Sequence, residues 1–193
     1  EIDPRTFSER VSAEWERVFM AADLPGTCRV AMRISIVLGR GGALPVLLRL
    51  ARLGLGGAHR DGWWPALPWR VAAGTHLPPL TRGGRQKFSW IHLDDFIGVV
   101  RFLRGHPEID GPLNLATPVA SDDRELMRVV RRTVGAPFGL PTFRWMLELG
   151  GLVLGTEAEL LIKSRWVVPA RLLEAGYEFR WTDLEAAVRS AWR

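Results

Sequence analysis

The first apolar residues of the chain recur at helical spacing. Between Thr6 and Ala22 they come at steps of three and four positions, at Phe7, Val11, Trp15, Val18, Phe19 and Ala22. One apolar stripe of this kind is typical of a helix that packs against a core. The pattern predicts a helix over 6–22 with a buried stripe, followed by a break at Leu24, Pro25 and Gly26.

A run of β-branched and apolar residues comes next. Residues 28–38 predict a buried strand that ends at Gly39, with Cys28 as an unreactive core residue at its start. The pair Gly41 and Gly42 then leads into an apolar segment, which predicts a helix over about 43–53.

The segment from Gly57 to Gly84 has no regular period. It holds four prolines and the tryptophans Trp63, Trp64 and Trp69, and it predicts a long irregular loop. The first expectation for these indole rings is packing against the body of the protein or a partner subunit, and the second is a lid over a ligand.

The following residues alternate between strand and helix patterns. Strands are predicted over 86–92 and 113–116, and helices from Leu93 and from Asp123 to about Gly135. Asp94 and Asp95 suit a helix start, where carboxylates meet unpaired backbone N–H groups. This alternation predicts an α/β fold with a parallel sheet.

The tail has a different, mostly helical pattern. Two apolar helical stretches are predicted between Pro141 and Gly176, then a short strand from Tyr177 to Trp181 and a last helix from Thr182. We therefore expect two units, residues 1–136 and residues 137–193.

Composition excludes several classes of protein. The 193 residues are 47% hydrophobic and 24% charged, which is typical of a globular protein. No stretch reaches the ~18 to 20 apolar residues of a membrane span, and no secretory signal is visible. A single cysteine cannot form an internal disulfide or a multi-cysteine zinc site. We expect a cytoplasmic protein with no membrane contact and no metal.

The formal net charge of +5 comes almost entirely from arginine, because Lys87 and Lys163 are the only lysines. The arginines are scattered at spacings that suit solvated helix faces rather than gathered in one patch. Nucleic acid is therefore not expected as a partner, and a small molecule is.

Three segments resemble the second half of the extended short-chain dehydrogenase/reductases. They are the strand and glycine element at 33–39, the strand-to-helix segment Ser89-Trp90-Ile91-His92-Leu93-Asp94-Asp95, and the strand at 111–116. Within that superfamily the residues are similar to those of the epimerase family proteins, through 41–44, 84–86, 159–169 and 172–177. The resemblance covers nearly all of Phe7 to Val188.

The resemblance implies the distal half of a Rossmann-type parallel sheet over 1–136 and the small helical C-terminal domain of this family over 137–193. It also implies NAD or NADP as the cofactor of the complete protein. Neither of the glycine-rich turns that bind a pyrophosphate, G-x-G-x-x-G or G-x-x-G-x-x-G, occurs in the sequence. We therefore expect the chain to be the C-terminal portion of a longer protein and to bind no cofactor alone.

The superfamily's acid/base pair is a tyrosine four residues before a lysine, since the lysine lowers the tyrosine pKa. In the matching helix the nearest positions hold Phe7 and Val11, and Tyr177, the only tyrosine, follows both lysines. The catalytic residues are therefore unassigned.

The sequence suggests five residues for substrate binding. An arginine inside an apolar strand, Arg33, needs a carboxylate or an anionic ligand group. The others lie where a loop passes into a strand and on to a helix, namely Arg85, Gln86, Trp90 and His92. For His92 the alternative is a structural brace of the turn, or a ring whose pKa the neighbouring carboxylates raise.

Two functions remain open on the sequence. One is a portion of an NAD(P)-dependent epimerase/dehydratase or reductase that acts on a small substrate, with a homodimer as a further expectation. The other is a non-catalytic Rossmann-like binding or scaffold protein that has lost the Tyr/Lys pair.

Overall fold

The computed structural model describes residues 7–63, 65–73, 76, 83–154, 164 and 166–192. The helices in that part are α1 (Phe7–Ala21), α2 (Ala43–Arg52), α3 (Pro68–Ala73), α4 (Leu93–Arg104), α5 (Asp123–Val134), α6 (Arg144–Leu154), α8 (Ala170–Glu174) and α9 (Leu184–Trp192). The strands are β1 (Val30–Ile34), β2 (Ile36–Leu38), β3 (His59–Arg60), β4 (Lys87–Phe88), β5 (Trp90–His92), β6 (Gly111–Leu115), β7 (Ser121–Asp122) and β8 (Thr142–Phe143). Trp64 and the stretch 159–163 lie outside the described residues.

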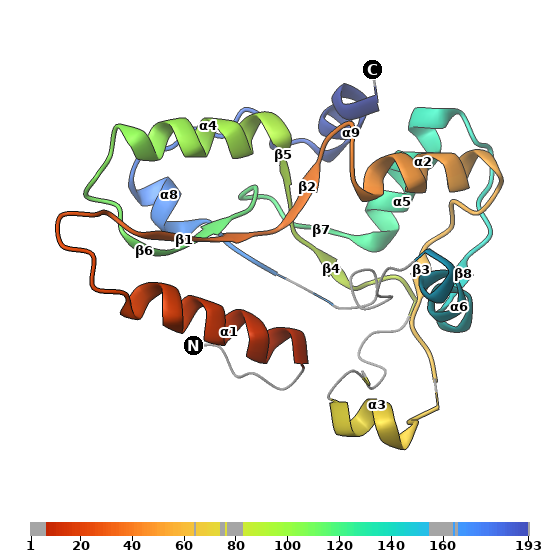
Figure 1. The fold of residues 1–193 in the computed structure, drawn as a ribbon. Helices are drawn as coiled ribbons and strands as arrows, with labels where there is room; N and C mark the ends of the chain where they lie inside the picture. Colours follow the sequence, from red (N-terminus) through yellow and green to blue (C-terminus); the bar gives the residue numbers. More distant parts are fainter. Residues whose placement is uncertain are drawn as a thin grey trace.

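The predicted parallel pairing is present, and the fold is α/β (Figure 1). β1 runs parallel to β6, with Val30 opposite Gly111, and β2 runs parallel to β5, with Ile36 opposite Trp90. Ser35 separates β1 from β2 because its backbone N–H and its hydroxyl both donate to the carbonyl of Leu115, at 3.0 and 2.7 Å. The single strand predicted over 28–38 therefore changes its hydrogen-bonded neighbour halfway along.

Two neighbouring residues of β5 point into two different core clusters. Trp90 and Ile91 are both fully buried, and side chains that are adjacent along a strand lie on opposite faces of the sheet. The Trp90 cluster joins residues of β2, α2, α5 and α9, and the Ile91 cluster joins residues of α4, β6 and α8. Fully burying side chains of this size contributes roughly 1.5 to 3 kcal/mol each.

The segment predicted as an irregular loop over 57–84 holds two regular elements, so that prediction is wrong in part. β3 pairs with β8 in parallel, and α3 follows it. His59 is buried, and its backbone N–H and its ring nitrogen both form hydrogen bonds with the Asp123 carboxylate, at 2.7 and 2.6 Å. A side chain 64 positions along the chain thus supplies the order that the local sequence lacks.

The described tryptophans of this segment do not pack onto the body of the chain. Trp63 is 81% exposed and Trp69 is 66% exposed, and α3 lies apart from the other helices (Figure 1). An ion pair between Arg70 and Glu148 of α6, at 3.0 Å, connects α3 to the rest of the fold. The expectation of packing is wrong within this chain, and contact with a partner subunit stays a prediction.

The prediction of a strand over 177–181 is also wrong. The backbone N–H groups of Arg180 and Trp181 donate to the two oxygens of the Asp95 carboxylate, both at 2.9 Å, instead of to a neighbouring strand. Asp95 is 2% exposed and lies in the first turn of α4. The sequence predicted a carboxylate in the first turn of this helix. It did not predict that this carboxylate also accepts hydrogen bonds from the backbone of the C-terminal segment.

The helix α1 has the predicted bounds but not the predicted burial. No residue of α1 is buried, and Trp15 is 73% exposed. α1 lies on one side of β1 and β6, while α4 and α8 lie on the other (Figure 1). The described residues therefore cover the apolar stripe only in part.

The strand β1 is likewise only half-buried, with Met32 and Ile34 39% and 49% exposed. Cys28 is exposed and precedes the strand, so the prediction of a buried core cysteine is wrong. Its thiol donates to the carbonyl of Ile109 at 3.2 Å. In the part of the chain that the structure describes, β1 pairs with β6 alone, which leaves its second edge open.

No described helix is both long enough and apolar enough to cross a lipid bilayer.

We expect Asp95→Asn to destabilise the protein by about 1.5 to 3 kcal/mol. Each oxygen of the Asp95 carboxylate accepts one backbone N–H, and in asparagine one of these oxygens is replaced by an NH2 group. That NH2 group would face a backbone N–H, so two hydrogen-bond donors would meet. The measurement is urea unfolding followed by tryptophan fluorescence. Asp94→Asn is the matched control, since Asp94 is half-exposed and the amide oxygen can still accept from the Trp181 ring. Equal losses for the two variants would contradict the role given to Asp95.

Candidate substrate cleft

A cleft of about 1150 Å³ lies between α1 and the exposed face of β1. Its further walls come from the N-terminal part of α2, from β4 and from residues 166–168. Polar and charged side chains line it beside the apolar ones: Ser8, Glu9, Ser12, Glu16, Arg33, Ser35, Gln86, Lys87, Ser89, Asn114 and Asp123. The cleft is therefore a surface that suits an amphipathic ligand or another polypeptide.

Arg33 makes the ion pair that its position in the strand demands. Its guanidinium meets the Glu16 carboxylate in a two-pronged arrangement, with nitrogen to oxygen distances of 2.6 and 2.8 Å. The hydrogen bonds from Arg33 hold the pKa of Glu16 below its ordinary value of 4.5, and the same contact raises the pKa of Arg33. Both residues line the cleft, so the pair also presents polar groups to whatever fills it.

Gln86 lies in the cleft wall and Arg85 does not belong to its described lining. Gln86 is buried, and its side-chain amide donates to the carbonyl of His59 at 3.1 Å. Arg85 is exposed. The two neighbours, which the sequence treats as one element, therefore differ in environment because the strand that follows turns them to opposite sides. Their binding roles stay predictions.

Trp90 and His92 lie in the protein interior and outside the described lining of the cleft. Trp90 is a central member of the larger core cluster. His92 caps α4 by accepting a hydrogen bond from the Asp94 N–H at 3.1 Å, and its ring lies 4.5 Å from that of Trp181. The structural contacts favour bracing, and a role in binding substrate stays a prediction for both.

The pKa of His92 is lowered, whereas the acidic neighbours were expected to raise it. Burial disfavours the charged ring and outweighs the attraction of Asp94 and Asp95. Nδ1 accepts from the backbone of α4, so the neutral ring carries its proton on Nε2.

Several polar groups of the cleft were missed by the sequence reasoning, and each already has a protein partner. The Ser89 hydroxyl accepts from the Val167 N–H at 2.8 Å, and the Lys87 ammonium lies 4.8 Å from the centre of the Trp166 ring. Asp123 binds His59. No local pattern could have identified them, because every partner is more than 60 positions away.

The cleft holds no proton-transfer pair of the tyrosine and lysine kind. The residues of α1 that line the cleft are Ser8, Glu9, Ser12, Trp15, Glu16 and Phe19. Phe7 and Val11 do not line it. The hydroxyl of Tyr177 donates to the carbonyl of Asp95 at 3.0 Å, and burial raises its pKa to about 12. Among the described residues there is also no cluster of three or more metal-binding side chains. The arrangement is suited to binding and orientation.

The fold is similar to that of solved epimerase structures. The chain matches the crystal structure of human epimerase family protein SDR39U1 with NADPH at a TM-score of 0.71 and 27% identity, over 96% of this chain and 55% of that one. It matches the nucleoside-diphosphate sugar epimerase of Corynebacterium glutamicum at a TM-score of 0.62 and 23% identity, over 95% and 30%. The class is therefore the Rossmann-type α/β fold of the short-chain dehydrogenase/reductases.

The family within this class follows from the sequence matches. Residues 142–191 match the model of a domain of unknown function, DUF1731. The chain is 32% identical over 188 residues to epimerase family protein SDR39U1 of Bos taurus, covering 95% of this chain and 54% of that protein. It is 26% identical over 174 residues to epimerase family protein YfhF of Bacillus subtilis, covering 90% and 49%. The predicted resemblance is confirmed: along nearly its whole length the chain is similar to epimerase family proteins, its residues 142–191 match DUF1731, and it spans about half of the length of those relatives.

We expect a double-mutant cycle of Glu16→Gln and Arg33→Gln to give a coupling of about 0.2 to 1 kcal/mol at neutral pH, since both side chains are partly exposed. Glu16 has a lowered pKa in the folded protein, so its contribution is present above 4.5 and is lost as the pH falls through the lowered value. The measurement is the free energy of unfolding of the four proteins against pH.

The Glu14 and Arg17 pair on the same helix serves as the control cycle, because both of its members are largely exposed. A coupling between Glu16 and Arg33 that does not decline in acid, or that the control pair equals, would contradict the assignment.

Proposed function

We propose that the chain is the substrate-side portion of an NAD(P)-dependent epimerase or reductase and that the cleft between α1 and β1 is part of its active site. The cleft is the observation that carries the proposal, because it combines an open strand edge, an apolar helix face and a set of polar side chains. The match to a relative solved with NADPH supports the choice of cofactor class.

The open edge of β1 has a specific occupant in this proposal. The relatives are about twice as long as the stretch they share with this chain, and a Rossmann-type sheet needs a glycine-rich strand, turn and helix for the pyrophosphate. A parallel strand from that cofactor-binding half would satisfy the free backbone groups of β1 and cover Met32 and Ile34. Trp15 and the rest of the α1 stripe would then become buried.

The substrate would lie in the cleft, with Arg33 and Gln86 as the binding residues of its wall and Arg85, which is exposed just outside the lining, as a contact from the adjoining loop. Trp90 and His92 are the weaker members of that set, since both are held in the interior. A cytoplasmic location and a homodimer stay predictions. The second candidate, a binding or scaffold protein, is favoured by the absence of a tyrosine and lysine pair from α1.

The isolated chain is expected to bind NADPH and NADH weakly or not at all, and the natural protein that contains it is expected to bind one of them. The measurement is calorimetric titration of both proteins, after the intact mass of the natural protein has been determined. A mass larger by roughly 10 kDa or more, together with binding by the larger protein alone, would support the proposal.

Two results would overturn it. Micromolar binding by the isolated chain would mean that the missing glycine-rich turn is unnecessary. A natural protein of the size of this chain without any nucleotide binding would favour the scaffold function.

In the cofactor-binding protein, Arg85→Ala is expected to weaken the binding of a nucleotide sugar such as UDP-glucose about tenfold or more, with little change in melting temperature, because an exposed arginine contributes little to the fold. Arg101→Ala on the exposed face of α4 is the matched control. A lower melting temperature with unchanged affinity would make Arg85 structural.

A further inference from the structure

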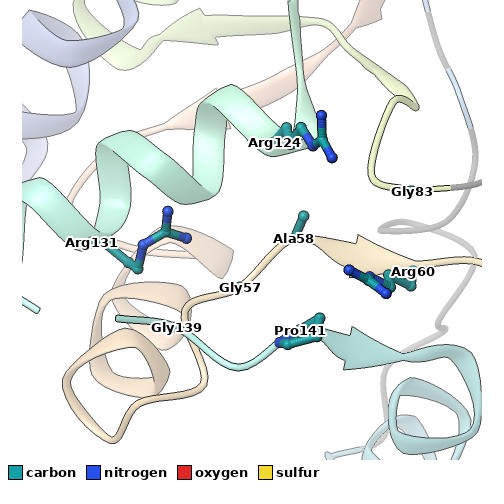
Figure 2. Close-up of a pocket in the computed structure, with 8 residues that line it drawn as sticks. All are labelled: Gly57, Ala58, Arg60, Gly83, Arg124, Arg131, Gly139 and Pro141. Carbon is teal, nitrogen blue, oxygen red and sulfur yellow. The ribbon is translucent and has the colours of Figure 1, made fainter. Parts of the chain in front are cut away.

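A second, smaller cavity lies outside the cleft and shares no lining residue with it. It has a volume of about 230 Å³ and lies between β3 with the two residues before it, one face of α5 and the segment before β8 (Figure 2). Its lining consists of three arginines, three glycines, an alanine and a proline: Arg60, Arg124, Arg131, Gly57, Gly83, Gly139, Ala58 and Pro141. No carboxylate belongs to it.

The arginines around this cavity have no carboxylate partner among the described residues, whereas other arginines of α5 have one. Arg128 and Arg132, on the same helix but outside the cavity, each have a carboxylate partner, Glu125 and Glu185, both at 3.6 Å. Arg124 has no ion pair within the described residues, and Arg131 donates to a carbonyl, that of Gly56, at 2.6 Å. Arg60 rests on the ring of Phe143, 5.8 Å from its centre.

The acidic residue next to Arg124 in the sequence is already paired. Asp123, which precedes Arg124, is buried and accepts hydrogen bonds from both the backbone and the ring of His59. Three guanidinium groups around one small space repel one another unless an anion lies between them. Figure 2 shows the three arginine side chains around the same space, from β3 and from two turns of α5.

The backbone that forms the floor of the cavity has little freedom to move. A Cβ atom at Gly57 would lie 2.5 Å from the carbonyl group of Leu140, and one at Gly139 would lie 2.5 Å from the carbonyl carbon of Gly56. Hydrogen bonds from Gly57 to Leu140 and from Leu140 to Gly54, at 3.0 and 2.8 Å, hold these two segments together. The cavity is therefore a preformed space rather than a gap between loose loops.

We propose that this cavity is a binding site for a phosphate group, either free inorganic phosphate or the phosphate of a small phosphorylated metabolite. Planar guanidinium groups match the tetrahedral oxygens of phosphate and donate to them in pairs. Arg124 forms no ion pair with any residue that the structure describes, so its charge is available to the ligand. Arg131, held by the Gly56 carbonyl, and Arg60, held against Phe143, would orient it from the other sides.

The buried pair of His59 and Asp123 lies between this cavity and the cleft. Asp123 lines the cleft and Arg124 lines the cavity, while Ala58 lines the cavity and its neighbour His59 holds Asp123. A phosphate between Arg60 and Arg124 would contact the sequence neighbours of both members of this pair. Binding there does not depend on the proposed function of the cleft.

The test is calorimetric titration of the chain with inorganic phosphate at constant ionic strength, in parallel with glucose 1-phosphate and with chloride. We expect saturable binding of phosphate that chloride does not reproduce. Arg124→Gln is expected to weaken it about tenfold or more, through loss of a charge-assisted contact. Arg128→Gln removes the same charge from the same helix outside the cavity and is expected to leave the affinity unchanged.

The outcomes separate the two sources of the ligand and the ways in which the proposal fails. Tighter binding of glucose 1-phosphate than of phosphate would identify a phosphorylated metabolite, and equal or weaker binding would identify free phosphate. Absence of saturation, or equal losses in Arg124→Gln and Arg128→Gln, would overturn the proposal in favour of diffuse electrostatic attraction. Arg124 is exposed, so the melting temperature of its variant without ligand should equal that of the wild type.

Discussion

The buried carboxylate of Asp95 is the interaction on which the arrangement of the chain depends. It lies at the start of α4 and accepts from the backbone of Arg180 and Trp181, so it joins the helix after β5 to the segment before α9. α9 in turn supplies Leu184, Ala187 and Val188 to the core cluster around Trp90. A charge that has lost its water must be hydrogen-bonded, and the backbone of the C-terminal segment provides two of the donors. This local requirement therefore positions the end of the chain on the sheet.

The pair formed by His59 and Asp123 performs the same task on the other side of the molecule. It draws an otherwise irregular stretch into contact with α5 and brings β3 beside β8. It also separates the two cavities, because Asp123 belongs to the wall of one and its sequence neighbours to the wall of the other. Loss of this pair would disturb both sites at once, and effects of mutations there cannot be assigned to either site alone.

Three incompletely covered surfaces of the chain have a common location. The exposed stripe of α1, the half-buried β1 and the open edge of that strand all border the cleft. Exposed apolar area next to unpaired strand backbone is a surface that favours another strand and its side chains. Several polar side chains beside it are already bonded within the protein: Glu16, Ser35, Gln86, Ser89, Asn114 and Asp123. This agrees with the proposal that the cleft is one wall of a site and needs a further part to complete it.

The sequence by itself determined the elements whose signals are local. The spacing of apolar residues predicted α1, α2, α4 and α5 closely, and the alternation of helices and strands predicted the α/β class, because amphipathic periodicity reports which face of an element is buried. It also predicted that Arg33 needs an anionic partner. Tertiary structure alone decided that the partner is Glu16, that Gln86 and Arg85 face different surroundings, and that α1 stays exposed.

The strand predicted over 177–181 failed for the same reason that the arginine cavity was missed. Backbone hydrogen bonds to the Asp95 side chain replace a strand partner, and Arg60, Arg124 and Arg131 are brought together from positions up to 71 residues apart. Periodicity describes one element at a time. Which carboxylate meets which backbone, and which charges are left facing one another without a counterion, are set only when distant elements pack.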